Sequence, residues 1–182
     1  MNIIWHGHSC FEITGKDGTI VFDPYQANSV PGLNSLKLKA NLVLCSHEHD
    51  DHNARNCVEV APKDFKVTCI ETYHDHHQGS HRGKNTIHIV DFEDLKVVHM
   101  GDIGCMMDDV SKLKNCDVLM IPIGGYYTID TKEALKYIER IQPRIVIPMH
   151  YHSHEFGYDV LSTNEEFIQQ SSNIVYVDDY LE

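Results

Sequence analysis

The sequence predicts an α/β fold, a layered sandwich that combines many short strands with a few amphipathic helices. Short apolar runs bounded by Gly, Pro, Asp and Asn recur along the chain, and two later stretches carry helix start signals. No linker, low-complexity segment or short repeat divides the sequence. With 182 residues, of which 42% are hydrophobic, we expect one domain over residues 1–182 that buries a core of its own.

The first part of the chain predicts strands. Residues 2–5, 10–14 and 19–23 are expected to form consecutive antiparallel strands, the last two joined across the turn-forming tetrapeptide Gly15-Lys16-Asp17-Gly18. A loop over residues 24–39 follows. The continuous apolar run at 41–45 is typical of a strand buried on both faces, and it leads directly into Ser46-His47.

The rest of the chain alternates further strands with short helices. Helices are expected at residues 53–60 and 108–114, and strands at 66–71, 85–91, 95–100, 117–122, 144–148 and 173–177. Two more helices have capping-box signals, Asp130 with Glu133 and Ser162 with Glu165. The first of these two is expected to end near Gln142-Pro143.

Composition excludes several classes of partner. The chain has 15 Lys+Arg against 27 Asp+Glu, a formal net charge of −12, which repels nucleic acid and anionic membranes at long range. No run approaches the roughly 20 apolar residues of a membrane span, and the amino terminus lacks the pattern of a signal peptide. The six cysteines form no C-x-x-C pair. We therefore expect a cytoplasmic protein with reduced thiols, a small-molecule substrate and no membrane or nucleic-acid partner.

Histidine is the informative excess. Residues 47–52, 74–81 and 150–154 hold three, four and three of the 14 histidines. Residues 46–52 place imidazoles and carboxylates so close together that their burial would cost several kcal/mol each unless cations neutralise them. A solvated polar loop is the alternative. His47 and His49 lie two apart and can share one metal, whereas Asp51 and His52 can point to a second.

The pattern His47, His49, Asp51 and His52 matches H-x-H-x-D-H and resembles the signature of the metallo-β-lactamase superfamily. The resemblance predicts four further positions, and each is occupied: Asp23 ends an early strand, His74 lies in a later loop, Asp102 follows a glycine, and His150 follows a buried strand. The segments 6–11, 121–128 and 147–151 look like the small metal-dependent hydrolases that resemble ascorbate-6-phosphate lactonase. The resemblance covers nearly the whole chain.

This resemblance implies an αββα sandwich, in which two mixed β-sheets pack face to face with helices outside. It also implies two divalent metal ions, zinc by default, with manganese, iron, cobalt or nickel acceptable to the same donors. One ion would be held by His47, His49 and His74, and the other by Asp51, His52 and His150. Asp102 would bridge the ions, and Asp23, His99 and His8 would support the ligands by hydrogen bonds.

The resemblance further implies hydrolysis of a small, anionic ester, lactone or phosphodiester by a hydroxide that the two metals share. Asp51 would also orient the nucleophile or accept its proton, as a catalytic residue. Arg82, Asn85, Tyr126 and Tyr127 are the expected substrate contacts. The alternative is a solvated loop for Arg82 and Asn85, and packing alone for the two tyrosines. The Gly-Tyr-Tyr sequence at 125–127 is also a candidate surface for a homo-oligomer.

Two points stay open on the sequence. His76, His77 and His81 compete with His74 for the place of the third ligand. Two other functions are compatible with the fold: a di-iron redox protein, whose relatives typically carry glutamate where this chain has His49, and a non-catalytic metal-binding module, which usually lacks a ligand.

Overall fold

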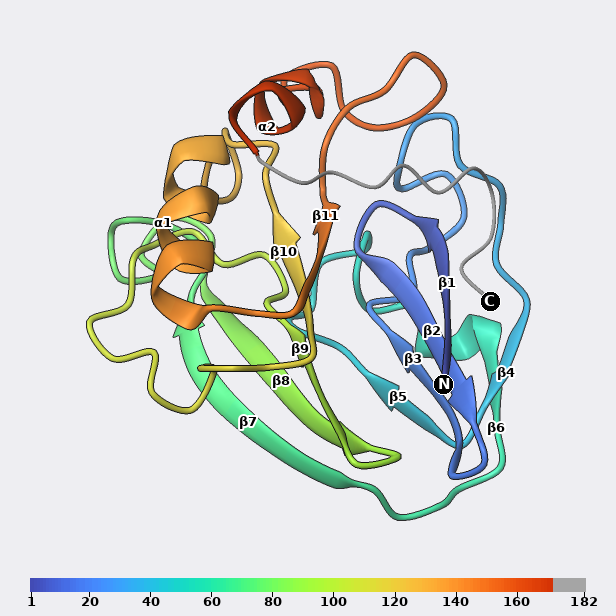
Figure 1. The fold of residues 1–182 in the computed structure, drawn as a ribbon. Coiled ribbons are helices and arrows are strands. Elements are labelled where there is room, and N and C mark those ends of the chain that lie inside the picture. The colour runs from blue at the N-terminus through green and yellow to red at the C-terminus, as the bar shows by residue number, and fades with distance from the viewer. Residues whose placement is uncertain (172–182) are drawn as a thin grey trace.

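A computed structural model describes residues 1–171 and builds them around two main β-sheets (Figure 1). The four-stranded sheet has the order β1-β2-β3-β5, with the bounds Asn2–Gly7, Cys10–Gly15, Gly18–Phe22 and Leu42–Leu44. The five-stranded sheet has the order β11-β10-β9-β8-β7, with the bounds Ile145–Met149, Val118–Pro122, Leu95–His99, Lys84–Phe92 and Lys66–Tyr73.

The first sheet confirms the predicted amino-terminal strands. β1 pairs antiparallel with β2, and β2 pairs antiparallel with β3 across the tight turn at Lys16-Asp17. β5 then pairs parallel with β3. The expectation that the run at 41–45 is buried on both faces is wrong, because β5 lies at the edge of the sheet and its side chains are half-buried.

The second sheet is mixed as well. β7, β8 and β9 form an antiparallel meander, whereas β9, β10 and β11 run parallel to one another. Helix α1, Thr131–Ile141, connects β10 to β11. Its predicted capping box is confirmed, since the Glu133 amide donates to the Asp130 carboxylate over 2.9 Å. The helix ends at Gln142, which takes the left-handed conformation.

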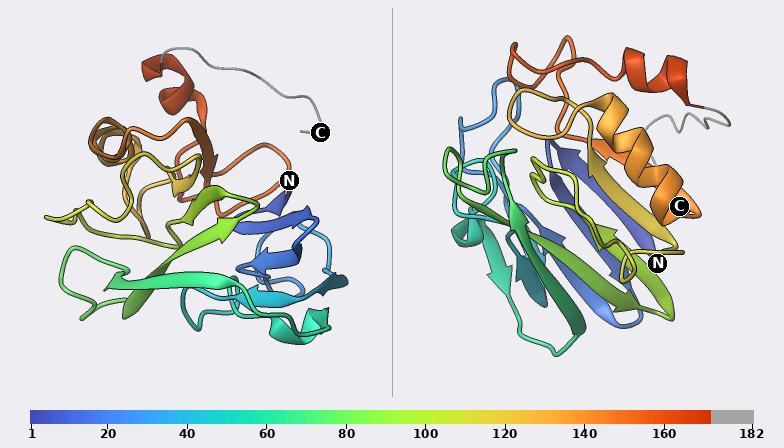
Figure 2. Two further views of the ribbon diagram at one scale, coloured as in Figure 1. Left: turned by 60° about the horizontal axis from the view of Figure 1, so that its bottom comes forward. Right: turned by 90° about the vertical axis from the view of Figure 1, so that its left-hand side faces the viewer.

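The two sheets pack face to face, as Figure 2 shows, and the predicted fold class is confirmed. Phe11 and Phe22 of the first sheet meet Phe92 and Met120 of the second in a core from which water is excluded. Helix α1 covers the outer face of the second sheet with side chains such as Ala134, Tyr137 and Ile141. The outer face of the first sheet is covered instead by the segment that contains Tyr25, Val30, Ala40 and Val58.

Two predicted short helices are wrong. Residues 53–60 contain only a 3-10 turn, Arg55–Cys57, followed by β6, Val58–Val60. β6 pairs parallel with β4, Leu38–Ala40, which forms at the end of the predicted loop. Residues 108–114 form turns, one of them closed by the Asp109 carboxylate, which accepts hydrogen bonds from Ser111.

The last described helix, α2, spans Glu165–Gln170; its N-cap position is Asn164, without a side-chain capping bond, rather than the predicted Ser162. Ser162 is held in an extended segment, because its amide donates to the Gly124 carbonyl and its carbonyl accepts from the His152 amide. The strand predicted at 173–177 lies outside the described residues. Within residues 1–171, no helix has the length and apolar character to cross a membrane.

Candidate metal centre

The topology brings the predicted ligands to one edge of the sandwich. Strands β1, β3 and β5 run in one direction in the first sheet, and β7, β9 and β11 run in one direction in the second. The carboxyl ends of each set therefore meet at one edge. The polar residues follow these ends directly: His8, Asp23, the loop 46–52, His74, Asp102 and His150.

Among residues 1–171, the structure contains three groups of side chains whose ligand atoms lie close enough together to hold a metal ion, and two of these groups share no residue. The ligand atoms of His47, His49 and His74 lie within 4.8 Å of each other, and we call these residues the first cluster. The same holds for the second cluster, which consists of His8, Asp51, His52 and His150. The two clusters contain the predicted terminal ligands of both ions. The additional member is His8.

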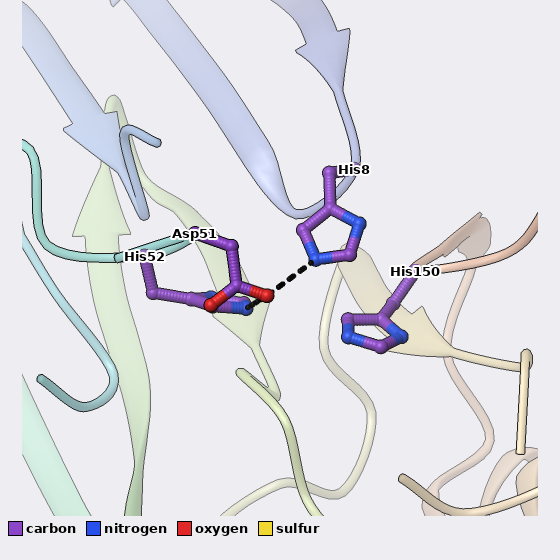
Figure 3. Close-up of side chains that lie close together, drawn as sticks. All are labelled: His8, Asp51, His52 and His150. Atoms are coloured by element: carbon purple, nitrogen blue, oxygen red, sulfur yellow. Dashed lines mark hydrogen bonds and ion pairs between the residues drawn. The ribbon is translucent and has the colours of Figure 1, made fainter. Parts of the chain in front are cut away.

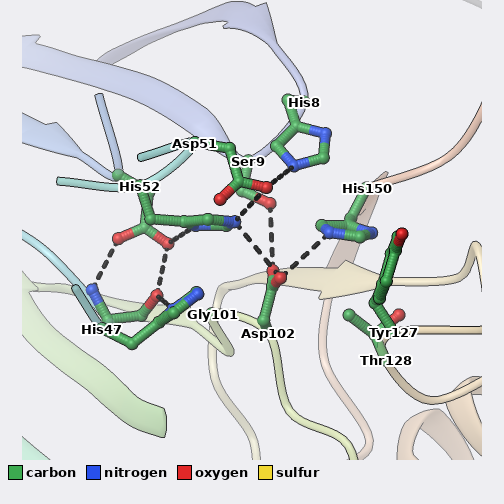
Figure 4. Close-up of polar contacts among 12 residues, drawn as sticks. His8, Ser9, His47, Asp51, His52, Gly101, Asp102, Tyr127, Thr128 and His150 are labelled. Atoms are coloured by element: carbon green, nitrogen blue, oxygen red, sulfur yellow. Dashed lines mark hydrogen bonds and ion pairs between the residues drawn. The ribbon is translucent and has the colours of Figure 1, made fainter. Parts of the chain in front are cut away.

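Asp102 contacts side chains of both clusters, and Figure 4 shows its contacts with His52 and His150. Its Oδ2 is 2.9 Å from Nε2 of His150, 3.2 Å from Nε2 of His52 and 3.4 Å from Nε2 of His74. The same carboxylate also groups with His47 and His52 within 4.8 Å. This position, in contact with side chains of both clusters, is the one a bridging carboxylate needs.

Buried hydrogen bonds fix the orientation of the histidines behind the centre. Asp23 accepts a bond from Nδ1 of His52 over 2.8 Å and one from the Ser46 hydroxyl over 2.6 Å. Ser46 in turn accepts from Nδ1 of His47 over 2.9 Å. One carboxylate thus holds both imidazoles with Nδ1 protonated, so that Nε2 is the free ligand atom. Asp23 thus lies behind His47 and His52, and its role as a supporting carboxylate stays a prediction.

The third imidazole is oriented from the second sheet. Nδ1 of His74 donates to the Tyr127 carbonyl over 3.1 Å, which again leaves Nε2 toward the centre. The competing histidines lie elsewhere: Nε2 of His76 lies 2.8 Å from the Glu133 carboxylate on helix α1, and the rings of His77 and His81 contact each other. Of the four histidines in this loop, the structure brings His74 to the cluster.

The donor set fits divalent metal ions. Nε2 of His47, His52 and His150 is buried and has no hydrogen-bond partner among residues 1–171, although these atoms lie beside carboxylates. A buried polar atom without a partner costs about 1–3 kcal/mol. Imidazole nitrogens and carboxylate oxygens that converge in this way are the donors that zinc and similar ions use. Two metal ions, one at each cluster, would satisfy these three nitrogens.

Electrostatics keeps the carboxylates ionised. Burial acts to raise the pKa of Asp102, but His150 and His52 beside it outweigh burial and hold this pKa well below its usual range. Burial lowers the pKa of His47 to about 3, and the proximity of His52 adds to the effect. Burial also acts to lower the pKa of His52, yet Asp102, Asp23 and Asp51 raise it well above its ordinary value. His52 must therefore release a proton when a cation binds.

His99 and Asn85 support the bridging position from behind. His99 accepts a bond from the Gly101 amide over 3.2 Å, donates to the Ser9 carbonyl over 2.9 Å and stacks on Phe22. Asn85 accepts from the Asp102 amide over 2.8 Å and donates to the Met100 carbonyl over 2.9 Å. Asn85 is fully buried. Asn85 was expected to contact the substrate, but its buried side chain instead holds the backbone around Asp102.

Two further polar residues were missed by sequence reasoning. The Tyr158 hydroxyl lies 2.7 Å from the Ser29 carbonyl and 3.3 Å from Oδ2 of Asp51. The buried Asp75 carboxylate accepts amide hydrogen bonds from residues 77, 79, 81 and 82, and so folds the loop that carries His74. A Tyr-His-Asp sequence is the only local signal for Asp75, and Tyr158 has none.

A cleft of about 430 Å³ opens beside the first cluster. Its lining includes His47, His49, Arg82 and Lys84. Lys84 forms an ion pair with Glu71, whereas the Arg82 guanidinium stacks over the Tyr127 ring at 5.3 Å and contacts no carboxylate among residues 1–171. Tyr126 is 64% exposed next to Tyr127. The cleft therefore offers one uncommitted cation close to the centre.

Comparison with known proteins identifies the family of this chain. The family model described as the beta-lactamase superfamily domain matches residues 2–150. The chain belongs to the metallo-β-lactamase superfamily. A UPF0173 metal-dependent hydrolase of Staphylothermus marinus is 30% identical over 81% of this chain and 82% of its own length, and the chain also belongs to that family.

Two further known proteins are similar to this chain over most of its length. A UPF0173 metal-dependent hydrolase of Thermoplasma acidophilum is 28% identical over 91% of this metallo-β-lactamase-fold chain and 88% of its own length. A crystal structure from Thermotoga maritima, described as a candidate Zn-dependent hydrolase of the superfamily, superposes with a TM-score of 0.79 at 27% identity. That alignment covers 100% of this chain and 91% of the other. The superfamily predicted from the histidine pattern is confirmed, and the narrower lactonase resemblance stays a prediction.

Proposed function

We propose that this metallo-β-lactamase-fold chain is a binuclear metal-dependent hydrolase, a single domain over residues 1–182 that acts in the cytoplasm on a small anionic ester, lactone or phosphodiester. The observation that carries the proposal is the set of buried Nε2 atoms of His47, His52 and His150, which lie around Asp102 without hydrogen-bond partners in the described part of the chain. Zinc is the proposed metal, because the donors are mostly imidazoles.

Each cluster would hold one ion. His47, His49 and His74 form the first site, and Asp51, His52 and His150 contribute to the second. Asp102 reaches both sites through its Oδ2. When bound, the ions would polarise the scissile group and lower the pKa of the attacking water.

Asp51 is the proposed catalytic carboxylate. Its Oδ2 lies 3.2 Å from Nε2 of His8 and 3.3 Å from the Tyr158 hydroxyl, so two neighbours fix the orientation of the group. His52 and His8 outweigh burial and keep the pKa of Asp51 well below its usual range. An ionised, oriented carboxylate can hold the attacking water and accept its proton.

The substrate would approach through the cleft beside His47 and His49. Arg82 can form charge-assisted hydrogen bonds to a carboxylate or phosphate group of the substrate. Tyr127 supports the Arg82 guanidinium, and the exposed Tyr126 next to it can close over the substrate. These contacts favour a small anion such as a sugar-phosphate lactone.

The test combines metal analysis with turnover. Protein purified without added metal or chelator is analysed for metal content and then assayed with bis-p-nitrophenyl phosphate and with a simple lactone. We expect about two ions per chain and turnover that a chelator abolishes and added Zn²⁺ restores. Failure to bind metal after reconstitution would overturn the centre. Two bound ions without turnover of either compound would leave the centre standing and contradict the proposed substrate class.

A further inference from the structure

The second cluster contains a side chain that no sequence signature places among the ligands. His8 follows β1, which lies far from the loop 46–52 in the sequence. Figure 3 shows its ring facing Asp51, His52 and His150. Nε2 of His8 lies 3.2 Å from Oδ2 of Asp51, and the ligand atoms of all four residues lie within 4.8 Å of one another.

We propose that His8 is a direct ligand of the second metal ion, together with Asp51, His52 and His150. This inference rests on the proposed binuclear centre and adds a third imidazole to its second site. Both sites would then present three imidazoles and share the Asp102 carboxylate. Imidazole-rich sites favour zinc, iron, cobalt or nickel over magnesium or calcium.

The backbone around His8 is shaped to place this ring. The pairing of β1 with β2 shifts register between Trp5 and Gly7, and His8 then takes a left-handed φ of 53°. A non-glycine residue in this region costs energy and persists only where its surroundings hold it. The His8 carbonyl accepts bonds from the Trp5 indole over 3.1 Å and from the His150 amide over 3.2 Å. The second bond ties His8 directly to a predicted ligand.

Burial argues against a merely solvated turn histidine. The side chains of His8 and His52 are 0% exposed and that of His150 is 1% exposed. The His8 ring lies 4.2 Å from the His150 ring and 5.3 Å from the His52 ring, measured between centroids. Within residues 1–171, Nδ1 of His8, Nε2 of His52 and both ring nitrogens of His150 are buried without hydrogen-bond partners. The Nε2 atoms of His52 and His150 therefore have room for a cation, and Nε2 of His8 lies in the same cluster beside Asp51.

A sheltered second site has a chemical consequence. The first cluster borders the cleft through His47 and the exposed His49, whereas the imidazoles of the second cluster are buried. A substrate would therefore meet the first ion, and the second ion would exchange more slowly with solvent and chelators. The two metals are expected to leave in two phases.

The alternative role for His8 is hydrogen bonding alone. In that case its Nε2 would carry a proton and donate to Asp51, and only Asp51, His52, His150 and Asp102 would contact the second ion. The two roles differ in whether a bond joins His8 to the metal. A spectroscopic measurement can detect that bond without any turnover.

The experiment loads the full chain with ¹¹³Cd²⁺ and records correlations between the metal and histidine ring protons. We expect couplings to the ring protons of His8, His52 and His150. Couplings to His52 and His150 without any to His8 would overturn this proposal and leave the binuclear centre standing. Absence of coupling to every residue of both clusters would overturn the proposed function itself.

A substitution gives an independent measurement. His8→Gln keeps an amide that can donate to Asp51 but removes the imidazole ligand. We expect its affinity for the second ion to fall by more than the roughly 10–100-fold that loss of a supporting partner costs. His88→Gln is the matched control, because His88 is also a buried histidine but lies outside both clusters. Wild-type affinity in folded His8→Gln, checked by its circular dichroism, would contradict direct ligation.

Discussion

Asp23 and His52 form a fully buried pair, in which Nδ1 of the imidazole donates to Oδ2 of the carboxylate over 2.8 Å. The same carboxylate accepts bonds from the amide and the hydroxyl of Ser46, each over 2.6 Å. Asp23 therefore connects the end of β3 to the loop that carries His47 and His49. His52 and His99 outweigh burial and keep the pKa of Asp23 well below its usual range.

Asp23→Asn is expected to weaken both the fold and the metal sites. Asparagine tolerates the left-handed φ of 42° at this position, so the backbone is not strained by the change. The amide cannot offer the same acceptors to Ser46 and His52, and the buried charge of His52 loses one of its three carboxylate neighbours. Metal affinity should fall by about 10–100-fold, and the metal-free chain should lose about 3–5 kcal/mol of unfolding free energy.

Urea denaturation and competitive metal titration measure these two effects. Asp91→Asn is the control, because it removes an ion pair with Lys66 in which the side chains are 43% and 81% exposed. Exposed pairs contribute about 0–1 kcal/mol. Equal losses in Asp23→Asn and Asp91→Asn would contradict the role given to the buried pair.

The residues of the candidate centre are indicated by local motifs, whereas several contacts around it depend on distant parts of the chain. The motif from His47 to His52 is local, and Asp102 and His150 follow strands whose apolar runs are visible in the sequence. Tyr158 reaches Asp51 from 107 residues away, so no local pattern indicates their contact. The contact between His8 and Asp51 depends likewise on a register shift in the β1–β2 hairpin, just before His8.

The wrong predictions of secondary structure likewise come from contacts between residues that lie far apart in the sequence. Residues 58–60 are a strand rather than a helix because they pair with residues 38–40, a partner that only the folded chain supplies. Ser162 does not cap a helix because it bonds to Gly124 and His152 instead. By contrast, the capping box at Asp130 and Glu133 is complete within four residues, and its prediction is confirmed. Local signals succeed where the stabilising contacts are local.

His88 is expected to make stability depend on pH even with the metal sites filled. Burial lowers its pKa from 6.5 to about 4, against a smaller opposing effect of Asp23. The unfolded chain therefore binds this proton more readily, so the stabilising contribution is complete above pH 6.5 and decreases as the pH falls toward 4. One such group changes the free energy of unfolding by about 3 kcal/mol over that interval.

The variant His88→Leu removes the titrating group and places an apolar side chain of similar size between the sheets. We expect the unfolding free energy of the wild type, minus that of the variant, to decrease as the pH falls from 7 to 4. Chemical denaturation at several pH values measures this difference. A pH profile of the variant parallel to that of the wild type would show that another group titrates.

Asp75→Asn is expected to loosen one metal site selectively. The Asp75 carboxylate accepts four backbone amides over 2.7–3.1 Å, and the amide group of asparagine would turn a donor toward some of them. The loop that follows His74 should lose its fixed shape. The affinity of the first site should fall about 10-fold or more, whereas the second site should keep its affinity.

A two-site metal titration separates these effects. Glu71→Gln serves as the control, since it removes an exposed carboxylate from the strand before the loop and disrupts only the ion pair with Lys84. Equal weakening of both sites in Asp75→Asn, or an equal effect of Glu71→Gln, would contradict a local positioning role for Asp75.

Arg82 provides the test of substrate charge. Among residues 1–171 the other arginines bond to carboxylates or carbonyl groups, namely Arg55 to Glu48, Arg144 to Asp117 and Arg140 to the Met107 carbonyl. Arg82 instead stacks on Tyr127 at the cleft. In a chain with a net charge of −12, an uncommitted guanidinium beside the centre favours an anionic ligand.

Arg82→Gln is therefore expected to raise KM about 10–100-fold for an anionic phosphodiester or phosphorylated lactone, which corresponds to the ~1.5–3 kcal/mol of a charge-assisted hydrogen bond. KM for an uncharged lactone should change little, and kcat should change less than KM, because the metal ligands are untouched. Lys84→Gln is the matched control, since Lys84 lines the same cleft but is already paired with Glu71. If Arg82→Gln affects charged and uncharged substrates equally, Arg82 shapes the cleft through its stacking on Tyr127 rather than by binding the substrate anion.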